Sequence, residues 1–211
     1  MSLSSTLLEN AVDQLATLPG IGRRTAMRLA LDLLRRETHE VVRFSEAVRA
    51  LRENVRYCER CCNISDRPVC EICANPARDS GLICVVEDIR DVIAIENTRQ
   101  FKGLYHVLGG VISPMDGIGP DDLNTRQLME RVAEGSTPNG AQVREVVLAL
   151  GGTLEGDTTG FYLNRRLNEQ GVLVTTIARG ISVGADLDQA DEITLGRSIA
   201  DRKPYEQSVR R

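Results

Sequence analysis

The sequence predicts an α+β protein of several domains: a helical bundle, a four-cysteine segment, an α/β domain with a mostly parallel sheet, and a short C-terminal strand or helix segment. Three observations predict this fold class. Apolar residues recur at helical spacing before residue 56, two Cys-x-x-Cys pairs follow, and short apolar runs alternate with helical patterns from residue 81 onward. We therefore divide the chain into domains at 1–56, 57–76, 81–176 and 177–211.

Composition limits the classes of protein to consider. Hydrophobic residues make up 42% of the 211 residues, which is ordinary for a globular protein. No apolar run reaches the roughly 20 residues that span a bilayer, and no signal peptide is recognisable, so we expect a cytoplasmic protein without a membrane partner. Reduced cysteines fit that compartment. With no Trp, three Phe and four Tyr, the chain has few side chains on which to stack bases.

Charge is unevenly distributed along the chain, whose net charge is −4. Arginines outnumber acids in residues 1–56, whereas acids outnumber basic residues in 81–176. Lys102 and Lys203 are the only lysines, and arginine suits bidentate contacts with phosphate. A genome-wide preference for arginine over lysine explains the same observation equally well.

Three helices are expected in the first domain. The first spans residues 5–17, the second begins at residue 23 and the third spans residues 38–56. Each has an apolar stripe at helical spacing. We expect the third helix to contribute its stripe to the core, namely Val41, Val42, Phe44, Val48, Leu51 and Val55.

The turn between the first two helices reads Leu-Pro-Gly-Ile-Gly over residues 18–22 and resembles a helix-hairpin-helix motif. In that motif the glycine turn exposes N–H groups at the start of the second helix, where they and the helix dipole hold a DNA phosphate. Contacts of this kind are independent of base sequence and weakened by salt. The alternative is a hairpin that only packs, as at a dimer interface. The residues assigned to DNA binding are Gly20, Gly22, Arg23, Arg24 and Arg28.

The four-cysteine segment carries the most specific pattern in the chain. Cys58 and Cys61 form one Cys-x-x-Cys pair, Cys70 and Cys73 form another, and eight residues lie between the pairs. This spacing predicts four thiolates around one tetrahedral Zn²⁺. A four-thiolate site leaves no open coordination position, so we expect a structural zinc ion and not a catalytic or redox centre.

Two further cysteines are not assigned to the metal. Cys62 competes with Cys61, but only Cys61 completes a Cys-x-x-Cys with Cys58. Cys84 lies within an apolar run and is expected in the core.

The α/β domain begins at residue 81. Strands are expected at 82–86, 104–108, 143–150 and 172–177, with helices at 88–97, 121–134 and 157–170. The long loop at 108–120 is a candidate binding surface, and residues 135–140 form a simple turn.

Acidic residues at the ends of these strands resemble part of a toprim site. Glu87 follows the first strand, Asp91 lies one helical turn later, and Glu155 follows the third strand. Catalytic toprim sites hold Mg²⁺ with such a Glu and an Asp-x-Asp. Here Gly151 and Thr153 stand at the two Asp positions. We therefore assign no catalytic residues and interpret the acids as a partner-binding surface.

The last segment is less informative. Residues 178–188 resemble a Walker B sequence only faintly, and no phosphate-binding loop accompanies them. An edge strand and turn at a subunit contact is the favoured interpretation. Residues 202–211 are expected to form a mobile basic tail.

Taken together, these motifs resemble the RecR recombination mediator family from about residue 7 to residue 203. The resemblance rests on the following residues: the 18–22 turn, the four cysteines, Glu87 with Asp91, the segment 113–122, Glu155-Gly156 and the segment 178–187. Two departures stand out: Gly151 replaces the usual Asn, and Arg24 replaces the usual Lys.

The resemblance implies a bacterial cytoplasmic DNA-repair protein without catalytic activity. Such proteins act with RecO and RecF to help load RecA onto gapped single-stranded DNA, and they form dimers and ring-like tetramers. Two alternatives remain: a Mg²⁺-dependent toprim enzyme acting on DNA, and a scaffold whose hairpin only dimerises.

Overall fold

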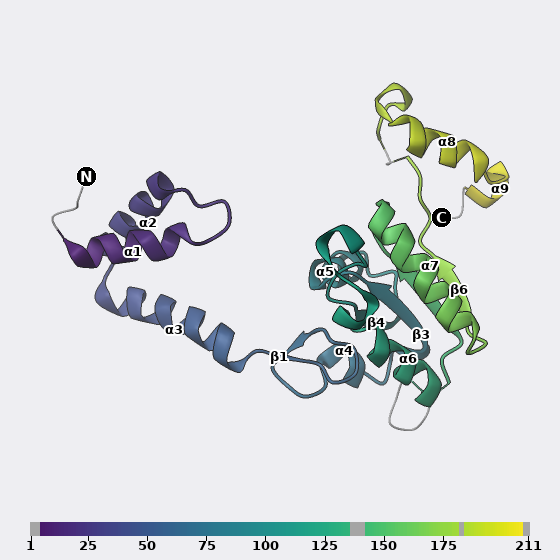
Figure 1. The fold of residues 1–211 in the computed structure, drawn as a ribbon, viewed down its shortest axis with the longest axis horizontal. Helices are drawn as coiled ribbons and strands as arrows, with labels where there is room; N and C mark the ends of the chain where they lie inside the picture. The colour runs from purple at the N-terminus through teal and green to yellow at the C-terminus, as the bar shows by residue number, and fades with distance from the viewer. Residues whose placement is uncertain (1–4, 136–141, 182–183, 209–211) are drawn as a thin grey trace. The chain divides into compact units, whose positions relative to one another are not determined.

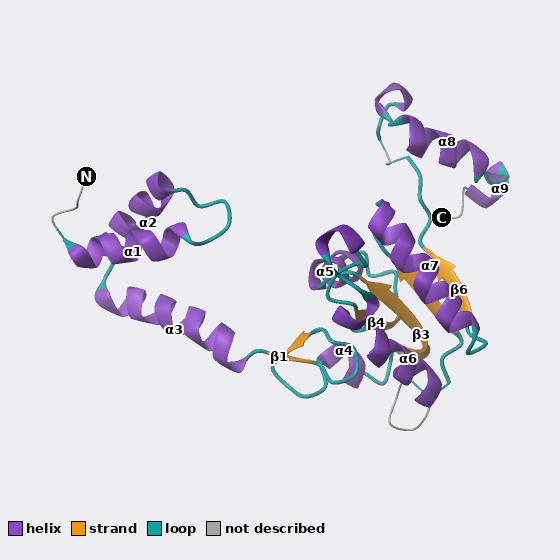
Figure 2. Ribbon diagram, in the orientation of Figure 1, coloured by secondary structure: helices purple, strands orange, loops and turns teal. Residues whose placement is uncertain are grey.

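The computed structural model describes residues 5–135, 142–181 and 184–208. Most of the expected turn at 135–140 and the last three residues of the expected tail lie outside these ranges. The chain forms two compact units, Met1–Val55 and Arg56–Arg211. Figure 1 labels most of their helices and strands, and Figure 2, coloured by secondary structure, shows helices in the first unit and both helices and strands in the second.

The first unit consists of three helices: α1 (Thr6–Ala16), α2 (Arg23–Arg35) and α3 (Thr38–Asn54). Val12 of α1 packs against Ala26 and Ala30 of α2, and all three side chains are buried. Small alanines allow the two helices to approach closely over a small core. This pairing fixes the turn between α1 and α2.

Helix α3 buries none of its residues. Phe44, Val48 and Leu51 are about half exposed or more, at 49%, 54% and 64%. The prediction that this helix contributes to the core is therefore wrong for the single chain. Its apolar stripe has no partner within the described part of the chain.

The second unit begins with the four-cysteine segment. Strands β1 (Arg56–Tyr57) and β2 (Ile64–Ser65) pair antiparallel, and the short helix α4 (Glu71–Ala74) follows. The first Cys-x-x-Cys lies in the turn between the two strands, and the second spans the start of α4. Two tight turns are thus brought face to face.

A four-stranded parallel sheet forms the core of the second unit, as predicted. Its strands are β3 (Asp79–Val86), β4 (Gly103–Val107), β5 (Glu145–Ala149) and β6 (Leu173–Thr176), in the order β4-β3-β5-β6. All three pairings are parallel. The carboxyl ends of the strands therefore meet at one edge.

Both faces of the sheet are covered. Helices α6 (Thr125–Glu134) and α7 (Leu154–Asn168) pack on the face that carries Ile83 and Val85. Helix α5 (Ile89–Asn97) packs on the other face, together with Cys62 of the four-cysteine segment, which we call the finger. Cys84 is buried on this second face, as predicted.

Two helix starts differ from the predicted ones. The prediction placed the start of α6 at residue 121, but a 3-10 turn (Pro120–Asp122) comes first and Leu123 is extended. Asn124 then holds β4, because its amide donates to the Val107 carbonyl at 3.0 Å. Helix α7 begins three residues earlier than predicted, since Thr153 caps it by accepting from the Gly156 N–H.

The C-terminal segment is helical and forms no strand within residues 177–181 and 184–208. It comprises a 3-10 turn (Leu187–Gln189), α8 (Glu192–Ala200) and α9 (Tyr205–Ser208). The favoured edge strand is therefore wrong for the described residues 178–181 and 184–188, which form only the beginning of the 3-10 turn. Asp191 then caps α8 by accepting from the Thr194 N–H at 2.8 Å. The two edge strands of the sheet are β4 and β6. None of the described helices is both long and apolar enough to cross a membrane.

Candidate functional site

The four predicted cysteines converge on one point. Their sulfur atoms all lie within 4.8 Å of one another, and all four side chains are buried. The sulfurs of Cys61 and Cys70 are 3.6 Å apart. Tetrahedral zinc with Zn–S bonds of about 2.3 Å requires sulfurs about 3.8 Å apart, so the cluster has the size of a zinc site. Across the described ranges, no other set of three or more metal-ligating side chains is this compact.

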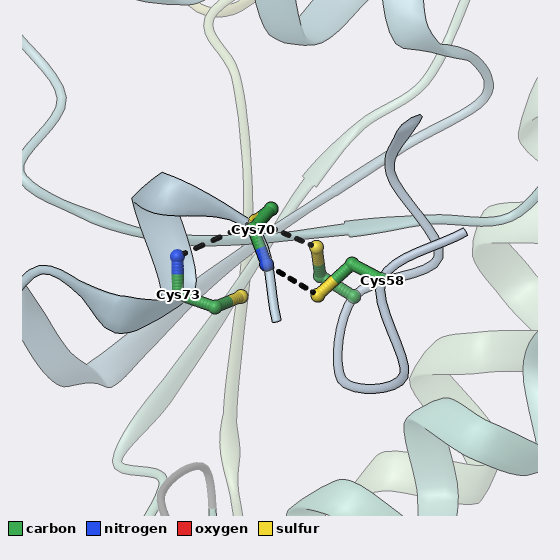
Figure 3. Close-up of side chains that lie close together, drawn as sticks. Cys58, Cys70 and Cys73 are labelled. Atoms are coloured by element: carbon green, nitrogen blue, oxygen red, sulfur yellow. Dashed lines mark hydrogen bonds between the residues drawn. The ribbon is translucent and has the colours of Figure 1, made fainter. Parts of the chain in front are cut away.

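Backbone N–H groups point at the sulfurs (Figure 3). The Cys70 N–H donates to Cys58 Sγ at 3.3 Å, and the Cys73 N–H donates to Cys70 Sγ at 3.4 Å. Hydrogen bonds from Cys61, then Cys70 and Cys73, hold the pKa of the Cys58 thiol well below its usual range. None of the six cysteines forms a disulfide.

The finger docks onto the outer edge of β4. The Val107 N–H donates to the Cys61 carbonyl at 2.8 Å. Cys62 has a φ of 59°, which turns its side chain away from the metal cluster and into the apolar layer under the sheet. The finger and the α/β domain thus share a core within the second unit.

The start of α2 has the form expected of an anion site. Gly20 takes a φ of 78°, in the left-handed region that favours glycine. Gly22 is the N-cap, and the helix has neither a side-chain cap nor an acidic residue in its first turn. The first N–H groups of a helix have no partner within the helix. At α2 they remain available to an outside anion.

The arginines near this turn fall into two groups. Arg23 is held by α1, because its guanidinium pairs with Asp13 at 2.6 Å and with Glu9 at 3.6 Å. Arg24 and Arg28 are exposed and pair with no carboxylate among the described residues. They line a groove of about 590 Å³, together with Thr25, Met27, Leu31, Asp32 and Arg35.

The predicted acids do not combine into a metal-binding set. Glu87 accepts a hydrogen bond from the Gly151 N–H across the strand ends. A β-carbon at Gly151 would lie 2.9 Å from the Glu87 carboxylate, so the missing side chain leaves space that Glu87 occupies. This position therefore has a structural role, in which the loop holds Glu87 by its backbone.

Asp91 and Glu155 have different surroundings. Asp91 accepts from the Asp88 N–H at 3.0 Å and completes a capping box at the start of α5. Glu155 lies in the first turn of α7 and forms no side-chain hydrogen bond or ion pair within the described ranges. Two of the three acids thus satisfy backbone groups of their own domain, and only Glu155 is free to contact another molecule.

Sequence reasoning missed two buried polar residues beside the finger. Arg131 is only 7% exposed, and its Nη1 donates to the Tyr105 carbonyl at 2.6 Å. His106 is fully buried, and its Nε2 lies 2.8 Å from the Asn124 carbonyl. Burial lowers the pKa of His106 to about 4, so the ring is neutral at physiological pH. One His in a strand and one Arg in a helix give no signal in the sequence.

Comparison with protein families covers almost the whole chain. Residues 8–52 match the model "RecR, helix-hairpin-helix", and residues 55–75 match the model of the RecR zinc finger domain with four cysteines. Residues 81–178 match a toprim domain, and residues 180–203 match "RecR, C-terminal". The four cysteines are therefore the structural zinc site of a RecR finger.

Similar full-length proteins support the same family assignment. Recombination protein RecR of Porphyromonas gingivalis is 58% identical over 206 residues, which cover 98% of this chain and 97% of that protein. The protein of the same name from Parabacteroides distasonis is 57% identical over 95% and 94% of the two chains. That from Flavobacterium johnsoniae is 53% identical over 100% and 99%. The chain belongs to the RecR family of DNA recombination and repair proteins.

Proposed function

We propose that this protein is a non-catalytic, DNA-binding recombination mediator. It acts with RecO and RecF to help load RecA onto gapped single-stranded DNA. The observation that carries the DNA-binding part is the start of α2, where uncapped N–H groups lie beside the exposed, unpaired Arg24 and Arg28. Backbone donors, a helix dipole and free guanidinium groups together suit a phosphate.

A salt series on two double variants tests this proposal. We expect Arg24→Ala/Arg28→Ala to weaken binding to single- and double-stranded DNA at least about tenfold at low salt and to reduce the salt slope by about one per arginine. The control is Arg49→Ala/Arg52→Ala on α3, which removes the same charge away from the groove. Equal affinities and slopes for both variants would favour a scaffold whose hairpin only dimerises.

The non-catalytic part rests on the acids of the toprim domain. Glu87 and Asp91 bind backbone N–H groups, and no hard-cation cluster forms in the described ranges. We expect no cleavage or relaxation of DNA with Mg²⁺. Mg²⁺-dependent cleavage that disappears in Glu87→Gln would establish the alternative, a toprim enzyme.

Self-association into dimers and ring-like tetramers is supported by α3. Its exposed Phe44, Val48 and Leu51 form an apolar stripe that monomeric surfaces rarely carry. We expect Phe44→Glu to lower the solution mass, measured by light scattering with and without DNA. An unchanged mass would remove α3 from the assembly contacts.

Partner binding is assigned to the acidic surface of the toprim domain. Glu155 is the acid to test, because its side chain caps nothing within the described residues. We expect Glu155→Lys to weaken binding of RecO or RecF, with Glu169→Lys at the far end of α7 as the control. A reducing cytoplasm is the proposed location, since the zinc thiolates must stay unoxidised.

A further inference from the structure

Arg131 of α6 is a buried cation without a carboxylate. Its Nη1 binds the Tyr105 carbonyl, whereas its Nε and Nη2 are buried and have no hydrogen-bond partner in the described ranges. A guanidinium group stays charged in proteins and carries five N–H donors. Buried charges are normally paired, because an isolated one loses its hydration without compensation. The surroundings of Arg131 should therefore contain a negative charge.

The strand that Arg131 holds is also the strand that holds the finger. Leu108 directs its N–H to β3, where it donates to the Val86 carbonyl at 2.9 Å. Because successive residues of a strand direct their N–H and C=O groups to opposite sides, Tyr105 and Val107 face the outer edge of β4. Arg131 occupies the first of these positions, and the Cys61 carbonyl occupies the second. The guanidinium and the cysteine cluster are thus neighbours on one strand edge.

We propose that Arg131 is the charge partner of the zinc–thiolate centre. Four thiolates around Zn²⁺ carry a net charge of about −2, and a buried centre of this kind needs compensation from its surroundings. The positive charge of Arg131 supplies it through space, since Nε and Nη2 donate to no sulfur in the described ranges, while Nη1 ties the same side chain to β4. Zinc retention by the finger thus depends on a helix of the toprim domain.

Zinc competition with the full-length protein tests the proposal. We expect Arg131→Met, which keeps an unbranched apolar stem but removes the charge, to weaken zinc affinity about 10- to 100-fold in a chelator titration, as loss of an outer partner of a metal ligand does. Arg131→Lys keeps the charge and should recover most of that affinity. Arg126→Met is the matched control, since Arg126 lies on the same helix, is 82% exposed and pairs with Glu130.

A second measurement uses the wild-type protein and does not depend on a variant that folds. Zinc is replaced by NMR-active cadmium, and N–H groups that respond to the metal are identified. The N–H groups of Cys70 and Cys73 serve as internal references, because they donate to Sγ atoms. We expect the chemical shift of an arginine side-chain N–H to change as well, through the field of the centre and not through a hydrogen bond to Sγ. Two results would overturn the proposal: a change in the signals of the backbone N–H groups alone, or unchanged zinc affinity in a folded Arg131→Met. The role of Arg131 would then be to hold β4 through the Tyr105 carbonyl.

Discussion

Two helices of this protein begin beside glycines, and their first turns are chemically opposite. Helix α2 starts at Gly22, without a side-chain cap and without an acid in its first turn. Helix α7 starts at Thr153, whose hydroxyl accepts from the Gly156 N–H at 3.1 Å, with Glu155 and Asp157 in its first turn. The first start is open to an anion, whereas the second is closed by its own side chains.

This difference between the first turns of α2 and α7 indicates where a nucleic acid can bind. A helix N-terminus attracts phosphate only while its N–H groups and its dipole are not already satisfied. In the toprim domain, α5 is closed by a capping box in the same way as α7 is closed by its cap. Among these three helix starts, only that of α2 combines free donors with free arginines.

The largest effect is expected from Gly156→Ala. A β-carbon there would lie 2.2 Å from the carbonyl oxygen of Gly151, so the loop or the helix must move. We expect a loss of about 3 kcal/mol in the free energy of unfolding. Gly22→Ala is the matched change at the open start, where a β-carbon meets nothing within 4 Å. Urea unfolding measures both, and equal losses would contradict the comparison.

Closing the open start should abolish most DNA binding. Gly22→Asp adds the cap and the negative charge that α7 already has, at a φ of −77° that any residue adopts. We expect affinity for DNA to fall at least about tenfold, which is about 1.4 kcal/mol, while helix content is retained. Gly22→Asn adds a neutral cap and should lose less. Equal DNA affinity of Gly22→Asp and wild type would show that phosphate does not bind at this turn.

Opening the closed start should change stability and not binding. Thr153→Ala removes the cap of α7 and should cost about 1 kcal/mol of unfolding free energy. DNA affinity is expected to stay at the wild-type value, because Glu155 and Asp157 still repel phosphate there. A gain in DNA affinity on this change would mean that the cap alone keeps the two starts distinct.

The smallest effect concerns Asp157 in the closed start. Arg179, at 2.7 Å, and then Arg197 lower the pKa of its carboxyl group. A lowered folded-state pKa stabilises the protein above the ordinary Asp pKa of about 3.9, and this contribution is lost as pH falls through the folded-state pKa. Because these side chains are 32–46% exposed and solvent screens the pairs, we expect Asp157→Asn to cost only a few tenths of a kcal/mol at pH 7. The difference should vanish in acid or in high salt, which thermal unfolding at several pH values measures.

Local patterns in the sequence accounted for the zinc site and the sheet. Two Cys-x-x-Cys pairs suffice to place four sulfurs, because each pair closes its own turn. Four apolar runs separated by helical patterns indicate a parallel sheet, since parallel strands need crossover connections. The glycines at residues 20 and 22 likewise indicate a tight turn, and the left-handed backbone at Gly20 is one that glycine adopts most easily.

Other predictions failed or stayed incomplete because they concerned partners in space. The stripe of α3 looks like a core face, but whether it is covered depends on what lies against it. Glu87 and Asp91 resemble ligands in the sequence, whereas the structure gives them backbone N–H partners. A strand was favoured within residues 178–188, whereas the described residues there form only the beginning of a 3-10 turn.

The sequence by itself determined the order of the domains, the four zinc ligands and the glycine turn before α2, since each depends on residues close together in the chain. Only the tertiary structure decided that the start of α2 is open while the starts of α5 and α7 are closed. It also placed Arg131 on the edge of β4 that the finger contacts, 58 residues after Cys73 in the chain. Burial and hydrogen bonding join residues that are distant in sequence, and a residue's type does not reveal which distant group it will meet.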